Sequence, residues 1–168
     1  MIGFVVEGPT DKAFIMGICN KLGLRCKRPR IMRGNKPKKA RAMAENLHNA
    51  GAEKVIVLKD MRSSPGLLRQ MERSIRNTAE LVVVKPMIEA WLLADPEAVE
   101  RVLGHRPRIR NPEECENPVD ELDRTAMRCG RRYLKSPKLV RRIVEEMDLE
   151  GARERCSSLD LFLRKLTS

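Results

Sequence analysis

The first twelve residues constrain the fold of this chain more than any other stretch. Residues 2–6 form a nearly unbroken apolar run, which predicts a strand buried on both faces. Glu7 follows the run directly, Gly8-Pro9 turns the chain, and residues 12–22 carry a helical pattern that Thr10 is expected to cap. Open α/β sheets place their ligands at the carboxyl ends of such strands. Glu7 is therefore the first candidate functional residue.

Three more strand-like segments alternate with helical patterns in the first hundred residues. The expected strands are residues 25–32, 54–58 and 81–84, and the expected helices are residues 36–50, 65–77 and 85–96. Alternation of this kind predicts an α/β fold with a mostly parallel, Rossmann-like sheet, and right-handed crossovers make it a three-layer sandwich. With an order such as 2-1-3-4, the first and third strands are neighbours and their carboxyl ends meet. The lone Trp91 lies in an apolar helical stretch and is expected in the core.

The carboxyl-terminal third has a different character. Residues 105–118 contain three prolines and predict a loop, and only helical patterns follow, over residues 119–133, 137–148 and 158–166. We expect residues 1–104 to form the α/β domain. Residues 105–168 are expected to be a helical extension packed on that domain as one structural unit.

Length and composition limit the classes of protein that this chain can form. Its 168 residues are enough for one good core. No apolar run approaches the ~20 residues of a membrane span, and the amino terminus lacks the pattern of a signal peptide, so we expect a cytoplasmic protein. The five cysteines are widely spaced without a CxxC motif, which argues against structural zinc. Cys19 and Cys26 are interpreted as buried free thiols.

The net charge of +11 is concentrated near the amino terminus. Residues 25–41 contain nine lysines or arginines and no acid, and residues 1–50 carry +8 of the total. Such a local field favours a polyanion, above all nucleic acid bound through its backbone without sequence-specific base contacts. A charged content of 34% with 3% aromatic residues is also typical of heat-adapted proteins with ion-pair networks. Both interpretations stay open at this point.

Three acidic residues share one topological feature. Glu7 ends the first strand, Asp60 comes just after the third, and Glu89 lies shortly after the fourth. Because parallel strands end at one edge of a sheet, we expect these carboxylates to gather there. Carboxylates beside basic residues suit a Mg²⁺ or Mn²⁺ ion that is shared with a phosphate. Asp11 and Asp95 are further candidate ligands.

Four stretches carry a resemblance to a known family. They are VVEGPTDKAFI near the amino terminus, IEAWLLADPEAV after the fourth strand, Asn117-Pro118 followed by Tyr133-Leu134-Lys135-Ser136-Pro137, and Ala152-Arg153 followed by Cys156-Ser157-Ser158. In these stretches the chain resembles the DUF4276 family of Toprim-like proteins, which has no assigned activity. The glutamate after the first strand and the aspartate after the third also resemble those of Toprim domains in topoisomerases, primases and OLD-type nucleases.

The resemblance implies a Toprim-like sheet and phosphodiester chemistry that depends on Mg²⁺ or Mn²⁺. Glu7 matches the general acid/base or metal ligand of Toprim enzymes, and Asp60 matches the first aspartate of their Asp-x-Asp metal motif. Arg62 stands where the second aspartate belongs and reverses the local charge, so that it repels a metal or holds a phosphate. Glu89 and Asp95 are the acids expected to replace the missing ligand.

These residues lead to two hypotheses for the function. The first is a Mg²⁺-dependent enzyme acting on nucleic-acid phosphodiesters, a nuclease above all, with Glu7 and Asp60 as catalytic residues. Its expected metal ligands are Glu7, Asp60, Glu89 and Asp95. The second is a module that binds nucleic acid or a protein partner without cutting, and Arg62 favours it.

Both hypotheses assign phosphate contacts to basic side chains beside the acids. These are Lys12, Arg33, Lys36, Lys38, Lys39, Lys59 and Arg62. Phosphoryl transfer on a small nucleotide is a weaker third hypothesis, because the sequence has no glycine-rich loop that cradles phosphate. The choice between DNA and RNA, the number of strands, any protein partner and a homodimer are left open.

Overall fold

The computed structural model describes all 168 residues and divides the chain into two compact units, Met1–Val84 and Lys85–Ser168. Unit 1 contains every strand, and unit 2 contains only helices and their connections. The predicted α/β class and the four-stranded parallel sheet are therefore confirmed. None of the helices combines the length and the apolar character that crossing a membrane requires.

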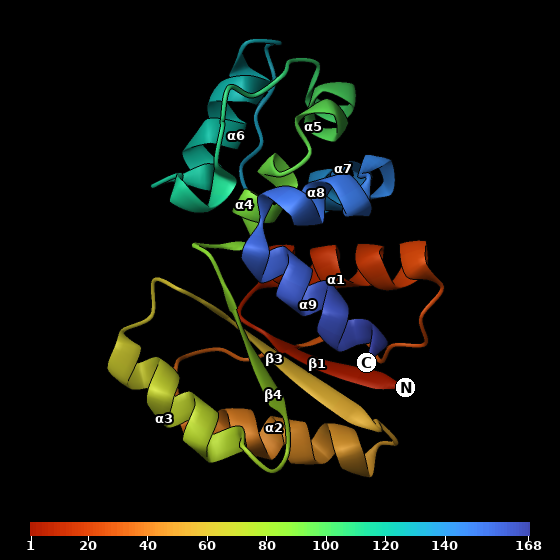
Figure 1. The fold of residues 1–168 in the computed structure, drawn as a ribbon, viewed down its shortest axis with the longest axis vertical. Helices are drawn as coiled ribbons and strands as arrows, with labels where there is room; N and C mark the ends of the chain where they lie inside the picture. The colour runs from red at the N-terminus through yellow and green to blue at the C-terminus, as the bar shows by residue number, and fades with distance from the viewer. The chain divides into compact units, whose positions relative to one another are not determined.

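Unit 1 alternates strands and helices along its whole length (Figure 1). In chain order its elements are β1 (Ile2–Val6), α1 (Pro9–Leu22), β2 (Arg30–Ile31), α2 (Pro37–Asn49), β3 (Lys54–Asp60), α3 (Pro65–Ile75) and β4 (Glu80–Val84). The sheet order is β2-β1-β3-β4, and every neighbouring pair is parallel. This order makes β1 and β3 the central strands.

Helices cover both faces of the sheet in unit 1 and give it three layers (Figure 1). On one face, Leu47 of α2 and Met71 of α3 pack in a cluster with Val5 of β1 and Val57 of β3. α1 lies on the opposite face, and its Phe14 is fully buried. Successive side chains of a strand point to opposite faces, so the unbroken apolar runs of β1 and β3 supply both layers.

The second strand is much shorter than predicted. Only Arg30–Ile31 pairs with β1, and a single isolated bridge joins Ile2 to Cys26. Pro29 stands between the two contacts and has no N–H to donate to a ladder. Cys26 forms a disulfide with Cys19 at the end of α1, with 6.4 Å between the two Cα atoms, so the interpretation of these residues as free thiols is wrong.

Two element ends in unit 1 also differ from the prediction. α1 begins at Pro9 with Gly8 as its N-cap, so Thr10 lies inside the first turn and does not cap the helix. Proline suits this position because the first helical N–H has no partner within the helix. β3 continues to Asp60, which pairs with Val84 of β4. The strand outlasts its apolar run because β4 still offers a pairing partner there.

Unit 2 begins at Lys85, and its first helices belong with the carboxyl-terminal ones. Its elements are α4 (Ile88–Leu93), α5 (Pro96–Leu103), the 3₁₀ turn η1 (Pro112–Glu114), α6 (Pro118–Met127), α7 (Pro137–Glu146), α8 (Leu149–Arg155) and α9 (Ser157–Thr167). α4 contacts α6, α7 and η1, and α5 contacts α7. These contacts place the division of the chain after Val84, whereas the sequence suggests residue 104.

The core of unit 2 is organised around the single tryptophan. Trp91 of α4 is fully buried, as predicted, and stacks on Phe162 of α9 with 5.3 Å between the ring centroids. Its indole N–H donates to the Ser158 hydroxyl over 2.8 Å. A buried indole N–H needs such a partner, so this contact fixes the start of α9 against α4.

The amino terminus of α9 receives a carboxylate from the loop before α6. Glu113 accepts hydrogen bonds from the hydroxyls of Ser157 and Ser158, over 2.8 and 2.6 Å, and from their backbone N–H groups, over 2.8 and 3.1 Å. Burial raises the pKa of Glu113, but these four donors outweigh it and hold the pKa below its ordinary value. Glu113 therefore satisfies free N–H groups at the start of α9 and fastens the loop to that helix.

We predict that Glu113→Gln lowers the free energy of unfolding at pH 7 by about 1–3 kcal/mol, because hydrogen bonds to a charged acceptor are lost. The folded pKa lies below the ordinary 4.5, so the stabilisation is complete above that value and is lost as the pH falls through the folded pKa. In urea denaturation the gap between wild type and variant should shrink in acid. Glu114→Gln, at the exposed neighbouring position, is the control and should change stability by less than about 0.5 kcal/mol. A gap that is as large in acid as at pH 7 would contradict this role.

Candidate functional site

The register of β1 and β3 brings two charged side chains together at the carboxyl edge of the sheet. Val5 pairs with Val57, and two residues further along each strand come Glu7 and Lys59. Side chains alternate along a strand, so these two lie on the same face as the valines. The Lys59 ammonium forms an ion pair with Oε1 of Glu7. The Lys59 side chain is 0% exposed and that of Glu7 is 25% exposed.

Two further contacts complete the surroundings of this ion pair. The Lys59 ammonium donates to Oδ1 of Asn35 over 2.6 Å. The backbone N–H of Asp60 donates to Oε2 of Glu7 over 3.0 Å. A fully buried ammonium is tolerated only when it is paired and hydrogen-bonded, so Glu7 and Asn35 together make the burial of Lys59 feasible. We call Glu7, Lys59 and Asn35 the edge cluster.

The sequence did not identify Asn35 as a functional residue. It lies in the Gly34-Asn35 pair, which reads as a break between a strand and a helix. The strand order was the available signal, because it places the end of β2 beside the end of β1. Met32, which follows β2, donates its N–H to the Val6 carbonyl over 2.8 Å. The two chain segments therefore stay side by side up to the start of the loop that contains Asn35.

The acidic side chain of the first helix turns back on its own backbone. Oδ2 of Asp11 accepts from the Gly8 N–H over 3.0 Å, and Asp11 is 8% exposed. Lys12, the next residue, is half-buried. Asp11 thus stabilises the turn that follows Glu7, which is a local reason for an acid at this position of the helix.

The predicted phosphate-binding residues of the loop and of α2 are exposed around the edge cluster. Arg33 and Lys36 flank Asn35 along the chain, and Lys38 follows in the first turn of α2. The Lys39 ammonium donates to the Arg33 carbonyl over 3.0 Å, which ties the helix to the loop. The structure therefore brings the basic segment and Glu7 to the same edge of unit 1.

Asp60 and Arg62 lie where β3 ends. Asp60 is half-buried as the last residue of the strand, and its carbonyl accepts from the Ser63 N–H over 3.1 Å. Arg62 is exposed in the turn between them. Asp60 is thus preceded by the buried Lys59, which pairs with Glu7, and is followed two positions later by the exposed Arg62.

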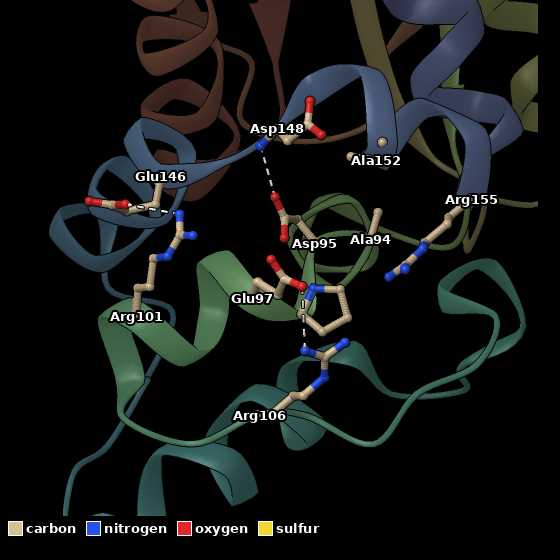
Figure 2. Close-up of a pocket in the computed structure, with 11 residues that line it drawn as sticks. Ala94, Asp95, Glu97, Arg101, Arg106, Glu146, Asp148, Ala152 and Arg155 are labelled. Carbon is tan, nitrogen blue, oxygen red and sulfur yellow. Dashed lines mark hydrogen bonds and ion pairs between the residues drawn. The ribbon is translucent and has the colours of Figure 1, made fainter.

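The two remaining predicted ligands belong to unit 2 and make local contacts there. Glu89 is 2% exposed, and its Oε2 accepts from the Tyr133 hydroxyl over 2.9 Å. Asp95 caps α5 by accepting from the Ala98 N–H over 3.1 Å, and it also accepts from the Asp148 N–H over 2.8 Å (Figure 2). A metal site shared by these acids with Glu7 and Asp60 stays a prediction.

The donor set at the edge cluster does not fit a divalent cation in this arrangement. Both oxygens of Glu7 accept from hydrogen-bond donors, one of them a buried ammonium. Mg²⁺ requires several oxygen ligands at about 2.0–2.1 Å. The positive charge of the neighbouring ammonium repels a divalent cation at this position. No group of three or more histidine, cysteine, aspartate or glutamate side chains is arranged to hold a metal ion in the structure.

Cys115 and Cys156 of unit 2 are not activated thiols. Burial and, to a lesser extent, the nearby Glu113 carboxylate raise the pKa of Cys156 to about 12. Burial also raises the pKa of Cys115. The thiolate is the nucleophilic form, so neither residue has the lowered pKa of a catalytic cysteine.

Comparison with known proteins gives one match. A family model described as a domain of unknown function (DUF4276) matches residues 6–167, which is nearly the whole chain. The match agrees with the family resemblance of the four sequence stretches. No curated protein and no solved structure matches the chain.

We predict an asymmetric pair of stability losses at the edge cluster. Glu7→Gln should lower the free energy of unfolding by about 3–5 kcal/mol, because it leaves the buried Lys59 ammonium without a counter-charge. Lys59→Met should cost less, because the partly exposed Glu7 carboxylate keeps contact with water.

The double variant Glu7→Gln/Lys59→Met removes both charges and should be more stable than Glu7→Gln alone. Urea denaturation of the four proteins gives the coupling free energy of the pair. Additive losses would show that Glu7 does not compensate Lys59.

Proposed function

The chain belongs to the DUF4276 family, whose description names no activity, and we propose that it binds the phosphate backbone of nucleic acid at the carboxyl edge of its sheet. The contact that carries the proposal is the hydrogen bond between Lys59 and Asn35, over 2.6 Å. It fastens residues 32–36, which we call the basic loop, to the end of the central strands. Binding at the carboxyl ends of strands, where the strand order reverses, is the general rule for open α/β sheets.

The charge around the loop supports a phosphate partner. Arg33, Lys36 and Lys38 are exposed, and none of them forms an ion pair. They stand before and in the first turn of α2, a helix of 13 residues with no acid in its first turn. The free N–H groups and the positive dipole end of such a helix add to the attraction for an anion. Lysine and arginine side chains at this density are the usual contacts to a nucleic-acid backbone.

The edge cluster acts in this proposal as a support for the phosphate contacts. Lys59 is fully buried, so its ammonium holds Glu7 and Asn35 and does not reach a ligand. Phosphate contacts then fall to the exposed residues of the loop and α2, with Arg62 after β3 as a further candidate. Arg62 replaces an acid that would repel a phosphate, which favours backbone binding at this position.

A Toprim-like, metal-dependent phosphodiesterase is the second candidate. One observation favours it: Glu7 and Asp60 end neighbouring strands, and the Asp60 N–H donates to Glu7 over 3.0 Å. These are the two carboxylates that the Toprim resemblance implies. Mg²⁺ or Mn²⁺ would supply charge neutralisation at phosphate in such an enzyme. The Lys59 ammonium on Glu7 is the observation that places this candidate second.

The binding proposal predicts a salt-dependent affinity that depends on the loop. Wild-type affinity for a fluorescein-labelled 20-mer duplex should fall steeply between 50 and 200 mM salt, since about 0.9 counterion is released per phosphate contact. Arg33→Gln/Lys36→Gln/Lys38→Gln should lower the log–log salt slope by about 2–3 through loss of three such contacts. Fluorescence anisotropy at several salt concentrations measures both quantities.

The matched control removes the same charge elsewhere in unit 1. Arg69, Arg73 and Arg76 are exposed residues of α3 or its carboxyl end, and none forms an ion pair. The triple variant Arg69→Gln/Arg73→Gln/Arg76→Gln should keep the wild-type slope. Equal effects of the two triple variants would mean that net charge alone, and not the loop, determines binding.

The enzyme candidate is tested with Mn²⁺ and Mg²⁺ on single- and double-stranded DNA and RNA. We expect wild type and Asp60→Asn to leave these substrates intact, because the Lys59 ammonium occupies the carboxylate that a metal would need. Asp60→Asn keeps the backbone N–H that Glu7 accepts, so the comparison does not depend on breaking the edge cluster. Metal-dependent cleavage that Asp60→Asn abolishes would establish the phosphodiesterase instead.

A further inference from the structure

Unit 2 contains a groove of about 640 Å³ whose charged lining is entirely basic. Arg106, Arg108 and Arg110 reach it from the loop between α5 and η1, and Arg155 reaches it from the last residue of α8. His105 also lines it, and no acidic side chain does. The sequence predicts this loop only as a proline-containing connection with alternating charge, so the groove is not anticipated by the amino-terminal concentration of charge.

The loop is held at both ends, which presents its arginines to the groove. At one end Arg106 forms an ion pair with Glu97 of α5 over 3.7 Å. At the other end Glu113 is fastened to the start of α9 by four hydrogen bonds. Pro107 is buried between alternate arginines. The loop is therefore attached to α5 at one end and to α9 at the other.

In a neighbouring cavity of about 360 Å³, two arginines are paired with acidic side chains. There Arg101 pairs with Glu146 over 3.6 Å, and Arg106 pairs with Glu97 (Figure 2). Arg155 extends into the same view with no such partner (Figure 2). Arg101 and Arg106 are thus compensated by acids, whereas Arg108 and Arg110, which line only the groove, and Arg155, which lines both, form no ion pair.

We propose that this arginine groove binds the phosphates of a nucleic-acid strand. Arginine presents a planar fork of donors that matches phosphate oxygens in pairs, and several uncompensated arginines together attract a chain of phosphates more than a single anion. Ile109 and Pro96 add apolar surface to the groove, which suits the sugars and bases between phosphates. The proposal uses only unit 2 and does not depend on the phosphate contacts proposed for the basic loop of unit 1.

The test neutralises two arginines whose side chains form no ion pair or hydrogen bond within the protein. Arg108→Gln/Arg110→Gln in the full chain should lower the affinity for a fluorescein-labelled single-stranded 20-mer by about tenfold. It should also lower the log–log salt slope by about 1.4, at about 0.7 per contact for single strands. Arg108→Lys/Arg110→Lys keeps the charge but not the fork, so it should retain the slope and lose part of the affinity.

The charge-matched control is Lys138→Gln/Arg142→Gln, at two exposed positions of α7 outside both cavities. It should bind the strand with wild-type affinity and slope. Equal losses in the control and in Arg108→Gln/Arg110→Gln would overturn the proposal. Saturable binding of adenosine triphosphate that depends on these arginines, with strand affinity unaffected by them, would also overturn it and identify a nucleotide site.

The result is distinguishable from the test of the basic loop in unit 1. Groove variants leave Arg33, Lys36 and Lys38 in place, and loop variants leave the groove in place. The salt slopes of the loop variant and of the groove variant are each compared with those of their own charge-matched control. Either proposal can therefore fail while the other stands.

Discussion

The buried ammonium of Lys59 is the constraint on which the carboxyl edge of the sheet depends. A lysine that is 0% exposed requires a counter-charge and hydrogen-bond acceptors within reach. The parallel register of β1 and β3 supplies the counter-charge by placing Glu7 beside it, and the loop between β2 and α2 supplies Asn35. Three strands must therefore be assembled before the lysine can be buried. The cluster couples the strand order to the position of the basic loop.

The chain handles positive charge in two ways. In several places an arginine is matched to an acid of its own unit, as Arg153 is to Asp160 over 2.7 Å and Arg132 is to Asp123 over 3.3 Å. The hydrogen bonds from these guanidinium groups lower the pKa of each aspartate, so each carboxylate stays ionised to a lower pH than a free aspartate does. Arg33, Lys36 and Lys38 have no such acid, and neither do Arg108, Arg110 and Arg155 of the arginine groove. An uncompensated cation cluster destabilises the free protein by mutual repulsion, so a bound polyanion relieves it.

Much of the fold can be predicted from the sequence because strand and helix patterns are local. The apolar runs locate β1, β3 and β4, Ser64-Pro65 locates the start of α3, and alternation along the chain fixes the parallel sheet. Glu7 and Asp60 can be placed at one edge for the same reason.

What escapes prediction depends on contacts between distant residues. A lysine after an apolar run reads as a surface residue, and only the register with Glu7 shows that it is buried. The disulfide between Cys19 and Cys26 requires the end of α1 to meet the bridge beside Ile2, which neither cysteine's own surroundings indicate. The arginine groove likewise joins Arg108 and Arg155, which are far apart in the sequence.

The two cations beside Asp60, Lys59 and Arg62, bear on whether this edge of the sheet binds a metal ion or a phosphate. A carboxylate at the end of β1 can be neutralised by a metal ion or by a protein ammonium, and the two cations repel each other when both lie beside it. In this chain Lys59 takes that place for Glu7, and Arg62 adds a second cation two residues later. A metal-dependent edge attracts phosphate through its ion, whereas this edge carries positive charge in the covalent chain. In the proposed binding function, protein cations at the end of the strands hold the phosphate backbone, and the ion pair between Lys59 and Glu7 separates this proposal from a metal-dependent one.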